Sequence, residues 1–156
     1  MHFCKIYHEY ILTVCIANFS ITAMLKFSYS KFPLNMKTSP KNITLSKDKK
    51  ILTVSFKDDD YALSSEYLRV YSPSAEVKGH GQGQETLQLN KQDVLISSIV
   101  PMGNYAIALH FSDGHTTGIY SWSYLLHLGV EEEELWLDYC NRVKENNNNN
   151  YHRVSI

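Results

Sequence analysis

Residues 68–84 of the chain read LRVYSPSAEVKGHGQGQ, and they join the end of a predicted helix to a long loop. Ser64 is suited to cap that helix, which we expect over residues 65–69. After the helix, proline and glycine interrupt regular structure, at Pro73, Gly79, Gly81 and Gly83. The composition therefore predicts a loop over residues 72–84.

Short segments rich in β-branched and apolar residues lie on both sides of this stretch. Strands are predicted over residues 43–45, 51–56, 61–63, 94–100, 105–111 and 118–120. Residues 51–56 alternate apolar with polar side chains, as a half-buried strand does. Turn-forming residues separate the strands at 47–50, 58–60, 101–104 and 113–114. Because these connections are short, the pattern favours antiparallel hairpins.

Two further helices are predicted in the last third of the chain. Ser121 or Ser123 can cap the first of them, and Gly129 is expected to end it. Four acidic residues at 131–134 open the last helix, at the end where its dipole favours anions. The asparagine-rich segment 146–156 predicts a disordered polar tail. The fold class expected is α+β, a small antiparallel sheet with flanking helices.

Length and charge narrow the classes of function. A chain of 156 residues suits one folded domain with a core of its own. The formal net charge of -1 lacks the positive field of a nucleic-acid-binding protein. Three cysteines at scattered positions form neither a C-x-x-C motif nor an even set, which favours the reducing cytoplasm.

Residues 1–35 differ from the rest of the chain. A partly apolar run at 10–25 is interrupted by polar residues and falls short of the roughly 20 apolar residues of a membrane span. Met36 opens a segment typical of a cytosolic start, so we expect residues 1–35 to be a mis-called start or a disordered extension. A membrane anchor and a signal peptide are the alternatives. The domain is then expected over residues 36–145.

Three motifs resemble those of the gamma-butyrobetaine hydroxylase-like N-terminal domain family, in its bacterial stand-alone form. They are residues 68–84, the segment from Gly103 to Trp122, and the closing Glu134-Leu-Trp. The resemblance implies the α+β fold over about residues 43–142. It also implies that no oxygenase activity carries over, because that chemistry belongs to a separate jelly-roll domain with a two-histidine, one-carboxylate iron site. No H-x-D or H-x-E motif occurs in this sequence.

The same resemblance implies a lost zinc site. In metal-carrying members, a Cys-x-Cys-x-x-Cys loop and a later histidine hold zinc. The corresponding positions here are Ser72, Ser74, Val77 and His115. Structural zinc needs four thiolate or imidazole ligands, and of these four residues His115 alone has such a group. No cofactor is therefore expected, beyond a residual divalent metal.

Residual metal binding is predicted at His115 and His80, with Asp113 or Glu76 as the carboxylate partner. The spacing of Asp113 and His115 allows both side chains to approach one ion. The alternative interpretation is structural, since Asp113-Gly114 is a common turn and a turn histidine often binds backbone.

Arg69 with Ser72 and Ser74 forms a second candidate site. A guanidinium beside hydroxyls is a common grip for carboxylate or phosphate. The alternative is a buried salt bridge from Arg69 to Glu66 or Glu76, which would hold the loop in place.

The sequence favours a non-catalytic interaction module with an unidentified protein partner. Its expected surface combines the 72–84 loop with the 113–119 turn and contains Arg69, Ser72, Ser74, Glu76, His80 and His115. Similar domains are fused to Mrp-like ATPases, so the resemblance suggests a role beside metal-cofactor or iron–sulfur handling. The alternative is a small metal-binding protein or metal-dependent enzyme using His80, His115 and a carboxylate. Neither nucleic acid nor a membrane is an expected partner, unless the 1–35 extension inserts.

Overall fold

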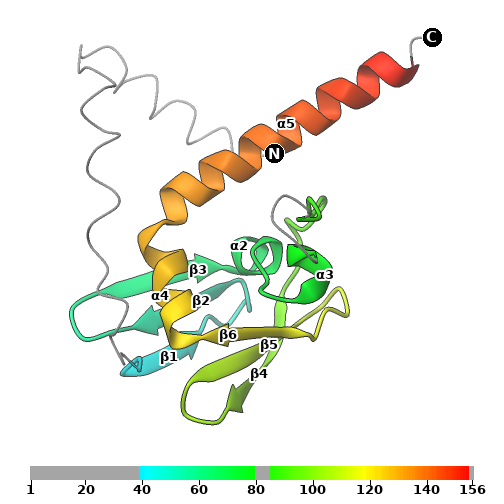
Figure 1. The fold of residues 1–156 in the computed structure, drawn as a ribbon. Helices are drawn as coiled ribbons and strands as arrows, with labels where there is room; N and C mark the ends of the chain where they lie inside the picture. The colour runs from blue at the N-terminus through cyan, green and yellow to red at the C-terminus, as the bar shows by residue number, and fades with distance from the viewer. Residues whose placement is uncertain (1–38, 80–84, 155–156) are drawn as a thin grey trace, which may run out of the picture. The chain divides into compact units, whose positions relative to one another are not determined.

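The computed structural model describes residues 39–79 and 85–154, with side chains described through residue 148. Its strands form two three-stranded antiparallel sheets, ordered β1-β2-β3 and β4-β5-β6 (Figure 1). The first sheet contains β1 (Asn42–Leu45), β2 (Ile51–Ser55) and β3 (Asp60–Ser64). The second contains β4 (Ile96–Met102), β5 (Ala106–Phe111) and β6 (Gly118–Ser121). The α+β fold class is confirmed, with two sheets in place of one.

In the first sheet, the alternation of residues directs one face of each strand inward. Leu52 pairs with Leu63, and Val54 pairs with Tyr61 across the β2–β3 ladder. Leu52, Val54 and Leu63 are fully buried. The predicted turn between β1 and β2 is present, and Lys49 adopts a left-handed conformation in it with φ of 60°.

In the second sheet, two short turns join consecutive strands. β4 begins and ends two residues later than predicted, and it includes Pro101. A proline is tolerated there because β4 is an edge strand, whose outer side has no ladder to lose. Gly103 and Gly114 supply the positive φ angles, 58° and 86°, that the β4–β5 and β5–β6 turns require.

Four helices are described: α2 (Ser65–Val70), α3 (Ala75–Lys78), α4 (Trp122–Val130) and α5 (Glu132–Val154). The caps of two of them are confirmed. Ser64 accepts a hydrogen bond from the Tyr67 amide, and Ser121 accepts one from the Tyr124 amide.

Three features of the helices differ from the sequence-based expectation. The predicted 72–84 loop contains one helical turn, α3, which Gly79 ends with φ of 67°. Gly129 lies inside α4 and does not end it. The backbone of α5 is helical to Val154, where a disordered tail was expected. Once the first turn of a helix has formed, each further residue adds a backbone hydrogen bond. Each asparagine lowers the stability of the helix by only about 0.7 kcal/mol relative to alanine.

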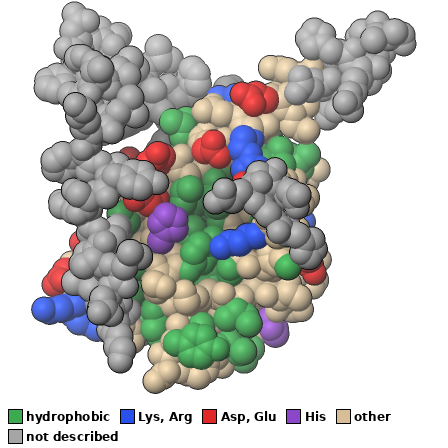
Figure 2. All heavy atoms as spheres, viewed as in Figure 1, with side chains coloured by type: hydrophobic (Ala, Val, Ile, Leu, Met, Phe, Trp, Pro, Cys, Tyr) green, Lys and Arg blue, Asp and Glu red, His purple; other side chains and the backbone are tan. Residues whose placement is uncertain are grey.

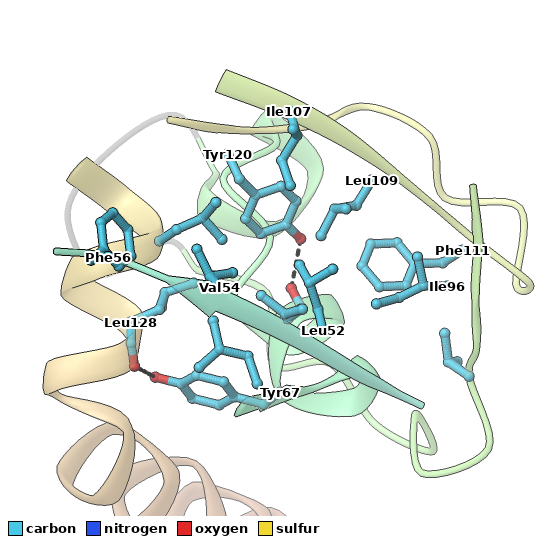
Figure 3. Close-up of a cluster of buried hydrophobic side chains, with 14 residues drawn as sticks. Leu52, Val54, Phe56, Tyr67, Ile96, Ile107, Leu109, Phe111, Tyr120 and Leu128 are labelled. Atoms are coloured by element: carbon cyan, nitrogen blue, oxygen red, sulfur yellow. Dashed lines mark hydrogen bonds between the residues drawn. The ribbon is translucent and has the colours of Figure 1, made fainter. Parts of the chain in front are cut away.

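Both sheets and two helices contribute to one core (Figure 3). Its fully buried members include Leu52 from β2, Leu109 from β5 and Leu125 from α4. Tyrosine hydroxyls at its edge donate hydrogen bonds to helix carbonyls, from Tyr67 to Leu128 and from Tyr120 to Leu68. These bonds join α2 to α4 and β6 to α2. Among the described residues, no helix is both long and apolar enough to cross a membrane.

Candidate functional site

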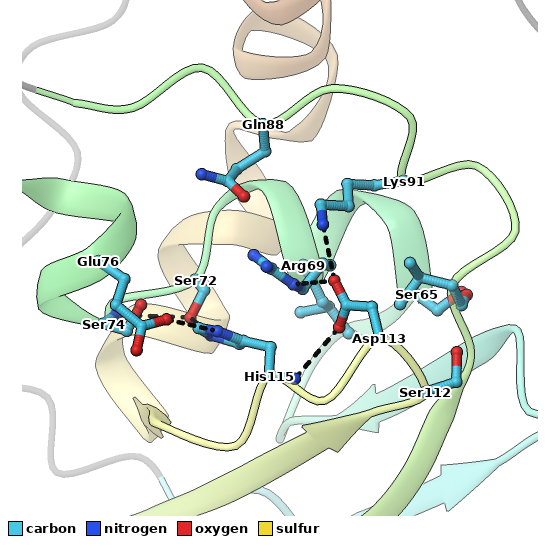
Figure 4. Close-up of polar contacts among 12 residues, drawn as sticks. Ser65, Arg69, Ser72, Ser74, Glu76, Gln88, Lys91, Ser112, Asp113 and His115 are labelled. Atoms are coloured by element: carbon cyan, nitrogen blue, oxygen red, sulfur yellow. Dashed lines mark hydrogen bonds and ion pairs between the residues drawn. The ribbon is translucent and has the colours of Figure 1, made fainter.

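A cluster of polar side chains lies where α2, α3 and the β5–β6 turn meet (Figure 4). Arg69 is in the last turn of α2, Ser72 follows that helix, and Ser74 precedes α3. Asp113 and His115 follow β5. Arg69, Ser72, Ser74 and His115 are all buried, with exposed fractions between 0% and 7%. We call Arg69, Ser72, Ser74, Glu76, Lys91, Asp113 and His115 the polar cluster.

Asp113 is the centre of an ion-pair network. Its Oδ2 atom lies 2.9 Å from Nε of Arg69 and 2.8 Å from Nζ of Lys91. Its Oδ1 atom accepts a hydrogen bond from the backbone N–H of His115 at 3.3 Å. Burial raises the pKa of Asp113, but the bonds from Lys91, His115 and Arg69 outweigh it and lower the pKa below its ordinary value. Asp113 therefore stays ionised.

His115 uses both ring nitrogens. Nε2 lies 2.8 Å from Oγ of Ser72, and Nδ1 lies 3.2 Å from Oε2 of Glu76. Burial and the nearby Arg69 charge lower the pKa of His115, although Glu76 opposes them. A neutral ring at pH 7 then donates from Nδ1 to the Glu76 carboxylate and accepts at Nε2 from the Ser72 hydroxyl.

Two atoms of the polar cluster lack a hydrogen-bond partner among the described residues, Nη1 of Arg69 and Oγ of Ser74. Ser74 occupies the N-cap position of α3, where a serine usually accepts from the helix amides, but its side chain makes no capping bond. An unpartnered buried polar group costs roughly 1–3 kcal/mol, and more if it is charged. These two atoms are therefore the places where the cluster is incomplete.

The four positions at which the family resemblance implies zinc ligands do lie together. The Ser72 hydroxyl contacts the His115 ring, and the amide of Ser74 lies 3.4 Å from Oγ of Ser72. The amide of Val77 donates to the carbonyl of Ser74 at 3.1 Å. The side chains present do not fit zinc, because neither serine ionises near neutrality and valine has no donor atom. In residues 39–79 and 85–154, no group of three or more His, Cys, Asp or Glu side chains is arranged to hold a metal ion.

The residual metal ligands predicted from the sequence do not converge in the described part of the chain. Asp113 directs its carboxylate to Arg69 and Lys91, whereas the His115 ring faces Ser72 and Glu76 (Figure 4). His80 lies outside the described residues.

The expected salt bridge of Arg69 exists, but its partner is Asp113 and not Glu66 or Glu76. Glu66 and Glu76 were expected as partners because they are close to Arg69 in the sequence. Asp113 lies 44 residues after Arg69, in the turn that follows β5. Two further contacts had no sequence signal. Lys91, in the loop before β4, forms an ion pair with Asp113. Gly118 leaves room for the Ser72 side chain, because a Cβ atom at residue 118 would lie 2.6 Å from Oγ of Ser72.

A cavity of about 310 Å³ adjoins the polar cluster on the side of α4 and α5. Ser72, Val77, Tyr124 and Tyr139 are among the residues that line it. Lys78 at its margin places Nζ 4.6 Å from the centre of the Tyr124 ring. Burial raises the pKa of Tyr124 to about 12, so its hydroxyl remains protonated and donates to the backbone oxygen of Tyr71.

Comparisons with known proteins agree with this fold. The family model described as gamma-butyrobetaine hydroxylase-like, N-terminal, matches residues 43–126. Two solution NMR structures of proteins are similar to the chain. The first is 42% identical with a TM-score of 0.61, and the match covers 69% of this chain and 85% of that chain. The second is 40% identical with a TM-score of 0.63, and the match covers 74% of this chain and 87% of that chain.

A crystal structure of a protein of unknown function from Acidithiobacillus ferrooxidans ATCC 23270, of the DUF971 family, is 35% identical with a TM-score of 0.49. The match covers 58% of this chain and 91% of that chain. No curated protein matches the sequence. The family match over residues 43–126 spans more than half of the chain. The chain therefore belongs to the gamma-butyrobetaine hydroxylase-like N-terminal domain family.

Proposed function

We propose that this domain is a non-catalytic binding module whose surface is formed by residues 72–79 and 113–119. The observation that carries the proposal is the incomplete polar cluster beneath that surface. Among the described residues, Nη1 of Arg69 and Oγ of Ser74 are buried without a hydrogen-bond partner, next to the bonds from Arg69 to Asp113 and between Ser72 and His115. Buried polar groups in natural proteins nearly always have a hydrogen-bond partner, so these two atoms call for one. A protein partner would supply the missing acceptor.

The outer surface above the cluster supports contact with a protein. Glu76 has a side chain that is 67% exposed, although its carboxylate reaches the His115 ring. Lys78 is exposed beside the Tyr124 ring, at the margin of the cavity. Figure 2 shows charged side chains beside hydrophobic ones on one face of the domain. Non-obligate interfaces have about the same share of apolar area as the rest of a protein surface, so a mixed face can serve as one.

A cytoplasmic location and an accessory role in metal-cofactor or iron–sulfur handling belong to the same proposal. The scattered, odd cysteine set supports the cytoplasm, because it is not the pattern of a disulfide framework. The accessory role is supported by the family resemblance, and it names no partner by itself.

A site-specific photo-crosslinker tests the proposed surface. The full chain carries the crosslinker at Ala75, which is exposed on α3, or at Asp59 in the turn before β3 as the matched control. We expect a discrete protein adduct from position 75 in native lysate, none from position 59, and loss of the adduct when Lys78→Glu reverses the charge beside it. Equal adducts from both positions, or none from position 75, would contradict the proposal.

A further inference from the structure

We propose that the group recognised by the polar cluster is a carboxylate, held by Nη1 of Arg69 and Oγ of Ser74. This inference rests on the proposed binding function and specifies the chemistry of its partner. Both atoms are buried and lack a partner among the described residues. A guanidinium nitrogen can donate and cannot accept, so the missing group must present an acceptor to Arg69. A hydroxyl can donate to a second acceptor, which a carboxylate provides as its other oxygen.

The charge of the cluster favours a monoanion. Arg69 and Lys91 carry two positive charges, and Asp113, which binds both, carries one negative charge. This leaves one positive charge in excess around Asp113. His115 adds none when neutral, because its pKa is lowered by burial and by Arg69. Glu76, the remaining acid of the cluster, is largely exposed and therefore screened by water. A carboxylate balances the excess charge, whereas a phosphate dianion exceeds it.

The position of Ser74 shows which bond its hydroxyl gives up. A serine at an N-cap position normally turns its oxygen to the helix amides, and it stabilises the helix by about 1 kcal/mol in doing so. Ser74 forgoes this bond, and its side chain lies with those of Ser72 and His115 in the polar cluster (Figure 4). The hydroxyl is therefore available to a ligand at the cost of helix stability.

Entry of a carboxylate requires a local opening, because both atoms are buried. α3 is four residues long, and the amides of Val77, Lys78 and Gly79 donate to the carbonyls of Ser74 and Ala75. One further backbone bond, from the amide of Thr86 to the carbonyl of Val77, ties α3 to the segment that follows. A single turn with few bonds opens at low free-energy cost. We therefore expect the amides of α3 to exchange hydrogen rapidly and to be protected when the carboxylate is bound.

The test is an NMR titration of the full chain with sodium acetate at constant ionic strength and neutral pH. We expect saturable shifts of the Arg69 Nε–H and Ser74 amide signals and slower exchange at Val77 and Lys78. Ser74→Ala should weaken acetate binding about fivefold, the effect of one hydrogen bond, whereas Ser97→Ala on β4 should not change it. Arg69→Lys should abolish binding, because an ammonium lacks the planar fork.

The remaining outcomes separate this inference from the proposed function. No saturable shift with acetate overturns the carboxylate site, even if the Ala75 crosslinker captures a partner. Acetate binding without any crosslinked partner supports the site and contradicts the protein-binding function. Inorganic sulfate, a dianion at neutral pH, overturns the assignment to a monoanion if it binds as tightly as acetate. An unchanged affinity in Ser74→Ala overturns the assignment of Oγ of Ser74 to the site.

Discussion

Nε of Arg69, near the end of α2, lies 2.9 Å from Oδ2 of Asp113, in the turn that follows β5. The two residues are 44 positions apart in the sequence, and their side chains are 8% and 19% exposed. The pair therefore connects the helix before the loop to the second sheet. Nη1 of the same guanidinium has no hydrogen-bond partner among the described residues.

The first prediction concerns this ion pair. Asp113→Asn should lower the free energy of unfolding by about 2–4 kcal/mol, because Arg69 stays buried with its charge uncompensated. Chemical denaturation measures the change, and Asp59→Asn, in the exposed turn before β3, is the matched control. In an Arg69→Met background the same substitution should cost much less. Equal costs in the two backgrounds would show that the pair is not coupled.

The second prediction is a pH dependence set by His115. Its pKa in the folded protein lies below the ordinary value of 6.5, chiefly because of burial, so folding disfavours the protonated ring. This contribution to stability is complete above the unfolded pKa and declines as the pH falls towards the folded pKa. Between about pH 7 and 5, the wild type should lose more stability than His115→Gln, as measured by urea denaturation at each pH. The reverse order would refute this assignment.

The third prediction concerns Gly129 of α4. A Cβ atom at this residue would lie 2.4 Å from Cγ of Tyr61, so the tyrosine ring must move. Gly129→Ala should therefore destabilise the protein by about 1–3 kcal/mol, although alanine is the better helix former by about 1 kcal/mol. In a Tyr61→Ala background the ring is absent, and the same substitution should become stabilising. A double-mutant cycle measures this reversal; a destabilising effect in both backgrounds would mean that Tyr61 is not the obstacle.

The fourth prediction tests the lost zinc site. The wild-type chain should contain no stoichiometric zinc after gentle purification, because Ser72, Ser74 and Val77 offer no thiolate. The triple substitution Ser72→Cys/Ser74→Cys/Val77→Cys should bind one zinc ion and raise the melting temperature in a way that a chelator reverses. Adding His115→Ala should weaken that binding. Elemental analysis gives the metal content, and tightly held zinc in the wild type would disprove the prediction and favour the metal-binding alternative.

The sequence by itself determined the local elements. Alternating residues in 51–56 specified a strand, and the serines at 64 and 121 marked where helices begin, because these signals act through neighbouring backbone atoms. The motifs also identified the family, which the comparison over residues 43–126 confirmed. The resemblance to a metal-binding pattern singled out Ser72, Ser74 and His115, whereas Arg69 was singled out because a guanidinium beside hydroxyls can bind an anion.

The contacts between distant segments were decided by the tertiary structure. Sequence spacing suggested Glu66 or Glu76 as a salt-bridge partner of Arg69, but the fold pairs Arg69 with Asp113, which also binds Lys91. Gly129 was expected to end a helix, but it lies inside α4, where the absence of a side chain leaves room for the Tyr61 ring. Such contacts join residues tens of positions apart, so they depend on how the sheets and helices pack. The polar cluster exists because that packing brings the end of α2 next to the turn after β5. A local sequence pattern cannot predict this contact, because the two segments are far apart in the sequence.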